Sequence, residues 1–176
     1  MTAQKFIMDW GTCVNRIANE AIAAGVPDVV EAFELVTASS SFGTLSTVPK
    51  AVRRFLMDAG LPRQCAPFLS FDALLDGPRE LAHLCDGATA AGLYVIGYDG
   101  AGNPLCLDSN LNWEVTHLDH EDDFQTRTFV ASSIFTLANA LVLIQTHLPN
   151  KDFILSRLQE IDPSSAASTS FFPREL

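Results

Sequence analysis

The chain has little positive charge, and the shortage is concentrated between residues 64 and 126. The full sequence carries 11 Lys and Arg residues against 21 Asp and Glu residues, which gives a formal net charge of −10. The whole excess lies in this segment, whose single base is Arg79. Its acids are Asp72, Asp76, Glu80, Asp86, Asp99, Asp108, Glu114, Asp119, Glu121, Asp122 and Asp123. A field of this sign attracts basic partners and argues against nucleic acid as a ligand.

We also expect no cysteine pairs, no secretion signal and no membrane span. Cys13, Cys65, Cys85 and Cys106 are widely spaced, so neither a redox pair nor a thiolate metal site is expected. The first residues lack the apolar core of a secretion signal. The most apolar stretch, 129–148, holds too many polar side chains for a membrane helix. We therefore expect a cytoplasmic protein with free thiols and no membrane partner.

Patterns that carry catalysis are missing as well. There is no Gly-x-Ser-x-Gly motif, and the glycine-rich stretch 97–102 joins two expected strands instead of opening a phosphate-binding helix. His117, Asp119, His120 and Glu121 are metal-ligand types, but their spacing matches no established motif. A polar strand end followed by a solvated loop is the simpler interpretation. We expect no catalytic residue, no cofactor and no metal, with a small metal-dependent enzyme as the weakest alternative.

What the sequence does contain is a helical region, then a strand region, then a second helical region. Helical spacing of apolar residues predicts helices over 12–24, 48–61, 132–148 and 151–161, and another helix starting at Pro27. Thr12 is the expected cap of the first helix and Gly60 the expected stop of the 48–61 helix. The residues 37–47 are expected to form a loop with a short strand near 43–46.

Alternation and β-branched residues predict the strands. They are expected at 68–71, 81–84, 93–98, 104–107, 113–118 and 128–131, with a tight turn at 99–103. The predicted fold is α+β: one domain over 1–176, with an antiparallel meander at about 93–118 flanked by N-terminal and C-terminal helices. The N-terminal part, 1–47, is expected to be helical. In the polar tail, 163–176, Phe171 and Phe172 are expected to dock back onto the body.

Several short motifs follow one another in a recognisable order. They are Gly60-Leu61-Pro62, Phe68-Leu69-Ser70-Phe71, the strand GLYVIGYD at 92–99, the strand PLCLD at 104–108, FVASS at 129–133, EIDP at 160–163 and the terminal pair Phe171-Phe172. This order resembles the SUKH superfamily, related to the yeast cell-wall regulator Smi1/Knr4, and most closely its SUKH-4 branch. The resemblance covers the chain from about residue 48 onward and is looser before it. Ala131 and Phe172 depart from the branch, which often has Asn and Trp there.

The resemblance implies a single α+β domain and, in bacteria, an immunity protein. Such proteins bind and block a cognate polymorphic toxin, often a nuclease or deaminase domain, and they are binders, not enzymes. Toxins that act on nucleic acid are commonly basic, so an acidic inhibitor would steer their encounter. The resemblance also allows a second function, a regulatory scaffold module of the Smi1/Knr4 type.

On this basis we expect a partner surface made of acids and aromatic anchors. The expected electrostatic contacts are Glu114, Asp119, Glu121, Asp122 and Asp123, and the expected aromatic anchors are Tyr94, Tyr98 and Trp113. For the acids the alternative interpretation is plain solubility. For the aromatic residues it is packing in the core.

Overall fold

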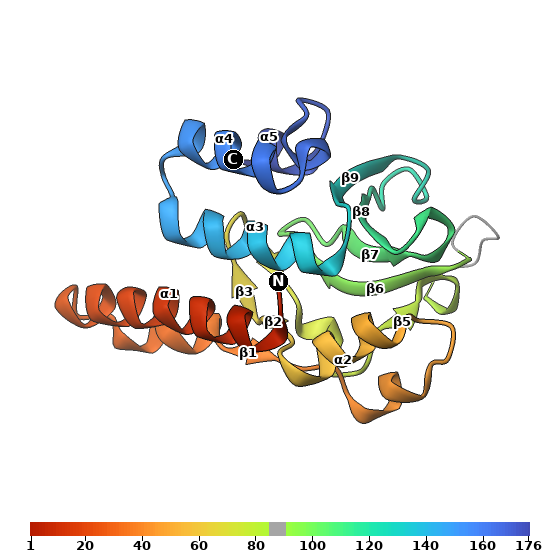
Figure 1. Cartoon of the computed structure of the whole chain (residues 1–176), viewed down its shortest axis with the longest axis horizontal. Coiled ribbons are helices and arrows are strands. Elements are labelled where there is room, and N and C mark those ends of the chain that lie inside the picture. The colour runs from red at the N-terminus through yellow and green to blue at the C-terminus, as the bar shows by residue number, and fades with distance from the viewer. Residues whose placement is uncertain (85–90) are drawn as a thin grey trace.

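A long helix and the antiparallel sheet that it covers form the centre of this computed structural model (Figure 1). The structure describes residues 1–84 and 91–176; for residues 27–29 it describes the backbone alone. Cys85 and Asp86 lie outside the described residues. The central helix, α3 (Ile134–His147), begins at a capping box. The Ser133 hydroxyl accepts from the Thr136 amide at 3.2 Å, and the Thr136 hydroxyl accepts from the Ser133 amide at 2.9 Å. Each side chain thus satisfies an amide that the first helical turn leaves free.

The buried residues of α3 explain why the helix lies across the sheet. Its buried side chains are Ile134, Leu137, Ala138, Ala140, Leu141 and Ile144. After the Leu148–Pro149 step the chain reverses into α4 (Lys151–Ile161), which Asn150 caps by accepting from the Phe153 amide. Among the described residues no helix is both long enough and apolar enough to cross a bilayer.

The main sheet is antiparallel throughout and contains the predicted meander. Its strands are β3 (Gln64–Cys65), β4 (Leu69–Ser70), β5 (Arg79–Glu80), β6 (Leu93–Tyr98), β7 (Pro104–Asp108), β8 (Glu114–Leu118) and β9 (Arg127–Ala131). The order is β3-β4-β6-β7-β8-β9, with β5 paired to β6. The predicted α+β class and the meander of 93–118 are therefore confirmed. A separate pair, β1 (Leu35–Val36) and β2 (Leu61–Pro62), lies in the N-terminal part.

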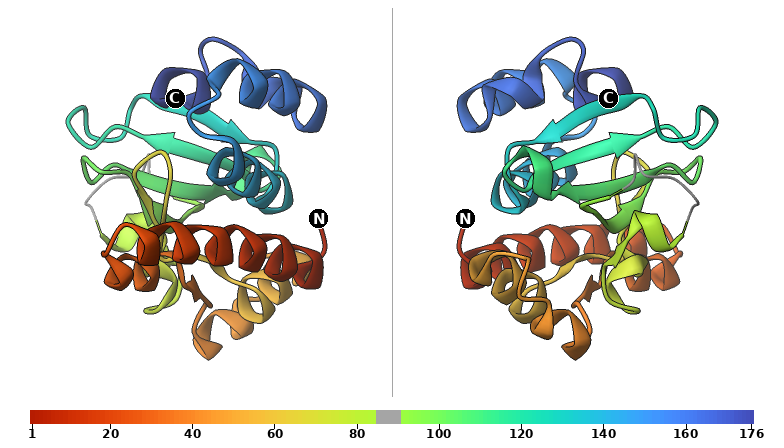
Figure 2. Two further views of the ribbon diagram at one scale, coloured as in Figure 1. Left: turned by 90° about the vertical axis from the view of Figure 1, so that its left-hand side faces the viewer. Right: turned by 90° about the vertical axis from the view of Figure 1, so that its right-hand side faces the viewer.

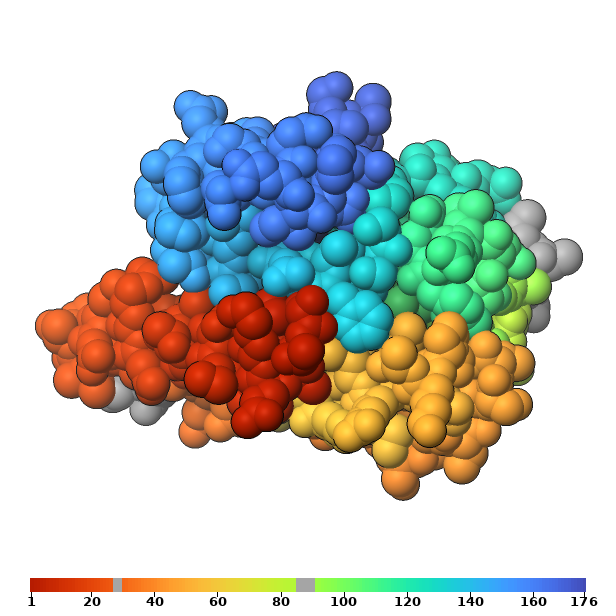
Figure 3. All heavy atoms as spheres, in the orientation of Figure 1, coloured from red at the N-terminus to blue at the C-terminus, as the bar shows by residue number. Residues whose placement is uncertain are grey.

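The two faces of the sheet are covered differently. One face packs on α3, in a core that also includes α1 (Ala3–Ala23), α2 (Lys50–Asp58), α4 and α5 (Phe171–Glu175). Figures 1 and 2 show α1 and α4 on opposite sides of α3. In Figure 3 the N-terminal residues and the C-terminal residues form separate parts of the surface, on either side of α3. The second face carries a small cluster, Leu81, Leu93, Val95, Cys106 and Leu118.

Short 3-10 helices complete the chain. They are η1 (Pro27–Phe33), η2 (Ser40–Thr44), η3 (Asp72–Leu74), η4 (Leu81–His83), η6 (Ser109–Leu111) and η7 (Pro163–Ala166). After η7, Phe171 and Phe172 pack into the core with 2% and 0% of their surface exposed. The predicted docking of the tail is thus confirmed.

Three local predictions are wrong. The first helix begins at Ala3, capped by Thr2, whereas Thr12 lies inside the helix and its hydroxyl donates to the Met8 carbonyl. The helix is longer because Phe6 and Trp10 bury their rings in the core, which outweighs the local capping signal at Thr12. Neither 43–46 nor 81–84 forms the expected strand: residues 43–44 lie in η2 and residues 81–83 in η4.

Gly60 offers a direct test of how β1 and β2 approach each other. Its φ is +69°, as its expected role as a helix stop requires, and a Cβ there would overlap the Val36 carbonyl. Gly25 has a similar φ of +76° but open space around it. We expect Gly25→Ala to lower the free energy of unfolding by about 1 kcal/mol through its left-handed backbone alone. Gly60→Ala should cost about 3 kcal/mol because overlap adds to that term. Urea denaturation measures both, and equal losses would contradict the close approach.

Candidate functional site

The turn between β6 and β7, at one end of the sheet, is closed by several hydrogen bonds to one carboxylate. The Asp99 carboxylate accepts from the amides of Ala101 and Asn103, at 2.9 and 2.8 Å, and from the Asn103 side chain at 2.9 Å. It also accepts from Nε2 of His117, the β8 residue 2.8 Å away. Burial opposes ionisation of this carboxyl, but the hydrogen bonds from Asn103, His117 and Ala101 outweigh it and lower the pKa of Asp99.

The same turn fixes the start of the loop after β8. The Asn103 side-chain oxygen accepts from the His120 amide at 3.0 Å and from His120 Nδ1 at 2.6 Å. Both histidines of the suggested metal cluster are thus engaged by the β6–β7 turn. Within residues 1–84 and 91–176, no group of three or more His, Cys, Asp or Glu side chains is arranged to hold a metal ion.

The acids of the 119–123 loop divide into two kinds. The Asp119 carboxylate accepts from the Glu121 amide, and the Asp122 carboxylate accepts from the amides of Gln125 and Thr126 at 3.0 Å. A hydrogen bond from the Thr126 side chain, followed by the bonds from the Thr126 and Gln125 amides, lowers the pKa of Asp122. Glu121 and Asp123 face solvent. Two acids therefore shape the loop, and two present free charge on it.

The predicted surface residues are not all brought together. Glu114 starts β8, at the end of the sheet opposite to the 119–123 loop, and pairs with Asp108 of β7. Asp108 is fully buried and bonds to Arg127 at 2.8 Å, whereas Asp162 accepts from the Ser132 amide at 2.7 Å. Burial first, and then repulsion from Asp108 and Asp162, raises the pKa of Glu114. Glu114 thus belongs to a separate acidic cluster.

The three predicted aromatic anchors differ in how far they are buried. Tyr94 is 9% exposed, stacks against the half-buried Trp113 with ring centroids 5.6 Å apart, and has its hydroxyl 3.2 Å from that of Thr47. Tyr98 is half-buried beside the cluster on the second face of the sheet, and burial raises the pKa of its hydroxyl. Tyr94 thus packs in the core, and the side chains of Tyr98 and Trp113 keep part of their surface accessible.

Phe68 is an exposed aromatic residue that the sequence reasoning placed in a strand and did not assign to the surface. It lies at the tip of the β3–β4 hairpin, is 83% exposed, and has a left-handed φ of +63°. Its neighbours Leu69 and Phe71 are buried at 1% and 0%. The signal that could have found it is this alternation, because Phe68 shares the polar side of the segment with Ser70.

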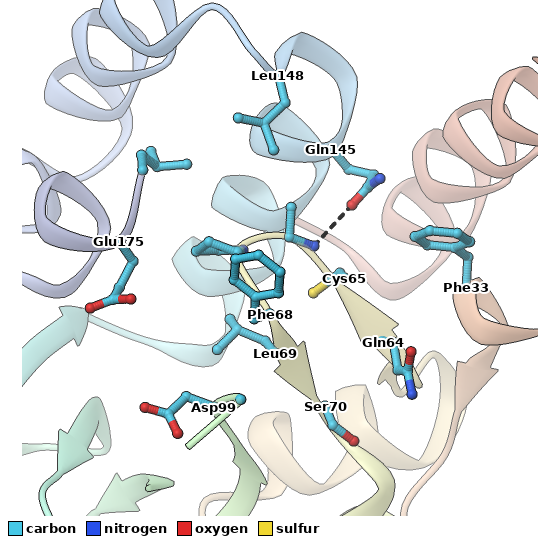
Figure 4. A pocket seen from close by; sticks show the side chains of 14 residues that line it. Phe33, Gln64, Cys65, Phe68, Leu69, Ser70, Asp99, Gln145, Leu148 and Glu175 are labelled. Atoms are coloured by element: carbon cyan, nitrogen blue, oxygen red, sulfur yellow. Dashed lines mark hydrogen bonds between the residues drawn. The ribbon is translucent and has the colours of Figure 1, made fainter. Parts of the chain in front are cut away.

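A pocket of about 660 Å³ adjoins the hairpin tip. Figure 4 shows Phe68 in the middle of it, with Phe33 on one side, Leu148 above, and Asp99 and Glu175 on the other side. We use "acidic sheet end" for the 99–103 turn, the 119–123 loop and Glu175, which lines a second, small pocket together with His117 and Asp119. The hairpin tip and the acidic sheet end are neighbours through Asp99 and Gly100, which line the larger pocket.

The raised pKa of Glu114 gives a pH prediction. An acid whose pKa is higher in the folded state than its ordinary value of 4.5 destabilises the fold above both values, and this cost disappears below 4.5. We therefore expect Glu114→Gln to be more stable than the parent protein at pH 7, and the difference to vanish as the pH falls below 4.5. Thermal denaturation across this range measures it. An advantage that persists at pH 3.5 would assign the effect to packing.

Comparison with known proteins adds one finding to this geometry. The model of the SUKH-4 immunity protein family matches residues 23–172, which extends the resemblance upstream of the motifs that first indicated it. No curated protein and no solved structure matches the chain. Because the match spans most of the sequence, including η1, the sheet, α3 and α4, the chain belongs to the SUKH-4 immunity protein family.

Proposed function

We propose that this protein neutralises a cognate toxin domain by covering its active site or substrate channel with the acidic sheet end. The proposal is supported by the family match over 23–172 together with the free acids of the 119–123 loop. Immunity proteins of this family act by binding, so the proposed function needs no catalytic group. The proposed site of action is the cytoplasm, where a toxin directed at nucleic acid would meet its substrate.

The charge of the surface favours a basic toxin, of the nuclease or deaminase type. Glu121 and Asp123 face solvent, and two nearby bases are engaged: Arg127 pairs with the buried Asp108, and Arg174 donates to the Thr128 hydroxyl. Exposed pairs contribute little to affinity, typically about 0–1 kcal/mol each. A field of one sign nevertheless raises the rate of encounter and orients the partner. An acidic surface would also compete with the phosphate backbone for the basic groups of the toxin.

The experiment that tests the proposal is co-expression with the toxin encoded beside this protein's gene. We expect the toxin domain alone to stop growth, co-expression to restore it, and the two purified proteins to form a complex on size exclusion. A scaffold protein of the Smi1/Knr4 type would give neither protection nor the complex. Continued toxicity in the presence of folded, soluble protein would refute the proposal.

Neutralising the free charges tests the role of the 119–123 loop. We expect the double variant Glu121→Gln/Asp123→Asn to associate with the toxin about 3- to 10-fold more slowly at low salt, and to show a weaker salt dependence, because steering depends on net charge. Asn tolerates the φ of +56° at residue 123, so the loop should stay intact.

The matched control removes two exposed acids elsewhere. Asp58 in α2 and Asp152 in α4 are both exposed, and Asp58→Asn/Asp152→Asn changes net charge by the same amount. Stopped-flow association should leave this control within about 2-fold of the parent protein, since it lacks the local field. Equal slowing in both variants would mean that only overall charge matters and that the loop is not a contact.

A further inference from the structure

Phe68 combines an unfavourable backbone conformation with a highly exposed side chain. Its ring is 83% exposed, while Leu69 and Phe71 on the other side of the segment fill the core. Its φ of +63° lies in the left-handed region, which is unfavourable for a bulky side chain. Exposed apolar surface and backbone strain together are a feature typical of binding sites, where a partner covers the side chain.

The hairpin tip that presents Phe68 is held in place. The Gln145 side-chain oxygen of α3 accepts from the Ala66 amide at 3.1 Å, which ties the tip to the end of the central helix. Cys65 is buried below it, and Gly100 approaches so closely that a Cβ there would lie 3.3 Å from the Cβ of Phe68. A fixed anchor loses little conformational entropy on binding, which favours affinity.

The pocket beside Phe68 combines apolar walls with an acidic rim. Phe33, Phe68 and Leu148 supply apolar surface, and Asp99 and Glu175 supply carboxylates at one side of the about 660 Å³ space (Figure 4). The hydrogen bonds at Asp99 keep that carboxylate charged. Such a pocket fits an aliphatic or aromatic side chain that has a lysine or arginine close to it in the partner.

The pocket is continuous with the acidic sheet end. Gly100 lies beside Phe68, Asp99 bonds to His117, and Asn103 bonds to His120 at the start of the 119–123 loop. A partner attracted by the loop would therefore meet the pocket on the same side of the protein. We propose that Phe68 and its pocket are the apolar anchor of the toxin interface and receive an apolar side chain flanked by a basic one, an inference that rests on the proposed function.

The test compares Phe68 with a matched exposed apolar residue. Leu111, in the β7–β8 connection at the opposite end of the sheet, is 47% exposed. We expect Phe68→Ala to weaken toxin binding at least about 30-fold, mainly through faster dissociation and at every salt concentration, because hot-spot anchors act after encounter. Leu111→Ala should stay within about 2-fold. Surface plasmon resonance with the purified toxin domain measures both rates.

A second variant separates binding from folding. Phe68→Gly relieves the left-handed backbone, so its melting temperature should not fall below that of the parent protein, although its toxin affinity falls as in Phe68→Ala. Weak binding with an unchanged or higher melting temperature supports the anchor. Unchanged affinity in both variants, with the parent protein still binding, overturns the anchor and leaves the proposed function intact.

A photo-crosslinking amino acid at position 68 tests the chemistry of the partner. Crosslinks to a toxin peptide with an apolar residue next to lysine or arginine support the inference, and crosslinks to a peptide without a base overturn it. A crosslink only to a second copy of this chain, with a dimer that Phe68→Ala dissolves, also overturns it. If the parent protein binds no toxin at all, the proposed function fails first and the inference fails with it.

Discussion

The Asp99 carboxylate holds together the end of the sheet on which the proposed interface lies. It closes its own turn through Ala101 and Asn103 and reaches across to His117 on β8. Asn103, oriented by this carboxylate, then fixes His120 and the start of the 119–123 loop. The Asp99 carboxylate thus positions both the turn and the loop. The acids of this sheet end therefore project from backbone that is held by hydrogen bonds.

The two ends of the meander carry negative charge for different reasons. At the acidic sheet end, Glu121 and Asp123 are free in solvent and can act at a distance. At the other end, Glu114 lies beside the buried Asp108 and its pKa is raised, so its charge costs stability. Exposed pairs contribute about 0–1 kcal/mol each and a central anchor about 2 kcal/mol or more. In the proposed complex, the loop would therefore set the rate of association and Phe68 the lifetime.

The sequence was a good guide where local chemistry and burial agree. The strand 93–98 and the helix 151–161 are predicted with the bounds that the structure has. The strand is rich in aromatic and β-branched residues and ends at a glycine-rich turn, and the helix lies between Pro149-Asn150 and Pro163. It failed at α1, where the buried rings of Phe6 and Trp10 extend the helix past the expected cap. The candidate site was only partly predictable. Net charge indicates an acidic segment, but the pairing of strands decides which acids lie close together. Phe68 is exposed because it lies at the tip of the β3–β4 hairpin, which was not predicted from the sequence.

Hydrogen–deuterium exchange of the protein with and without its toxin tests the central claim most directly. The account predicts slowed exchange in the complex in three segments, 64–70, 99–103 and 119–126, which together carry the hairpin tip and the acidic sheet end. The opposite end, 109–114, should exchange at the same rate in both states. Protection confined to 109–114 or to α1, with the three segments unchanged, would contradict the assignment of this surface as the toxin interface.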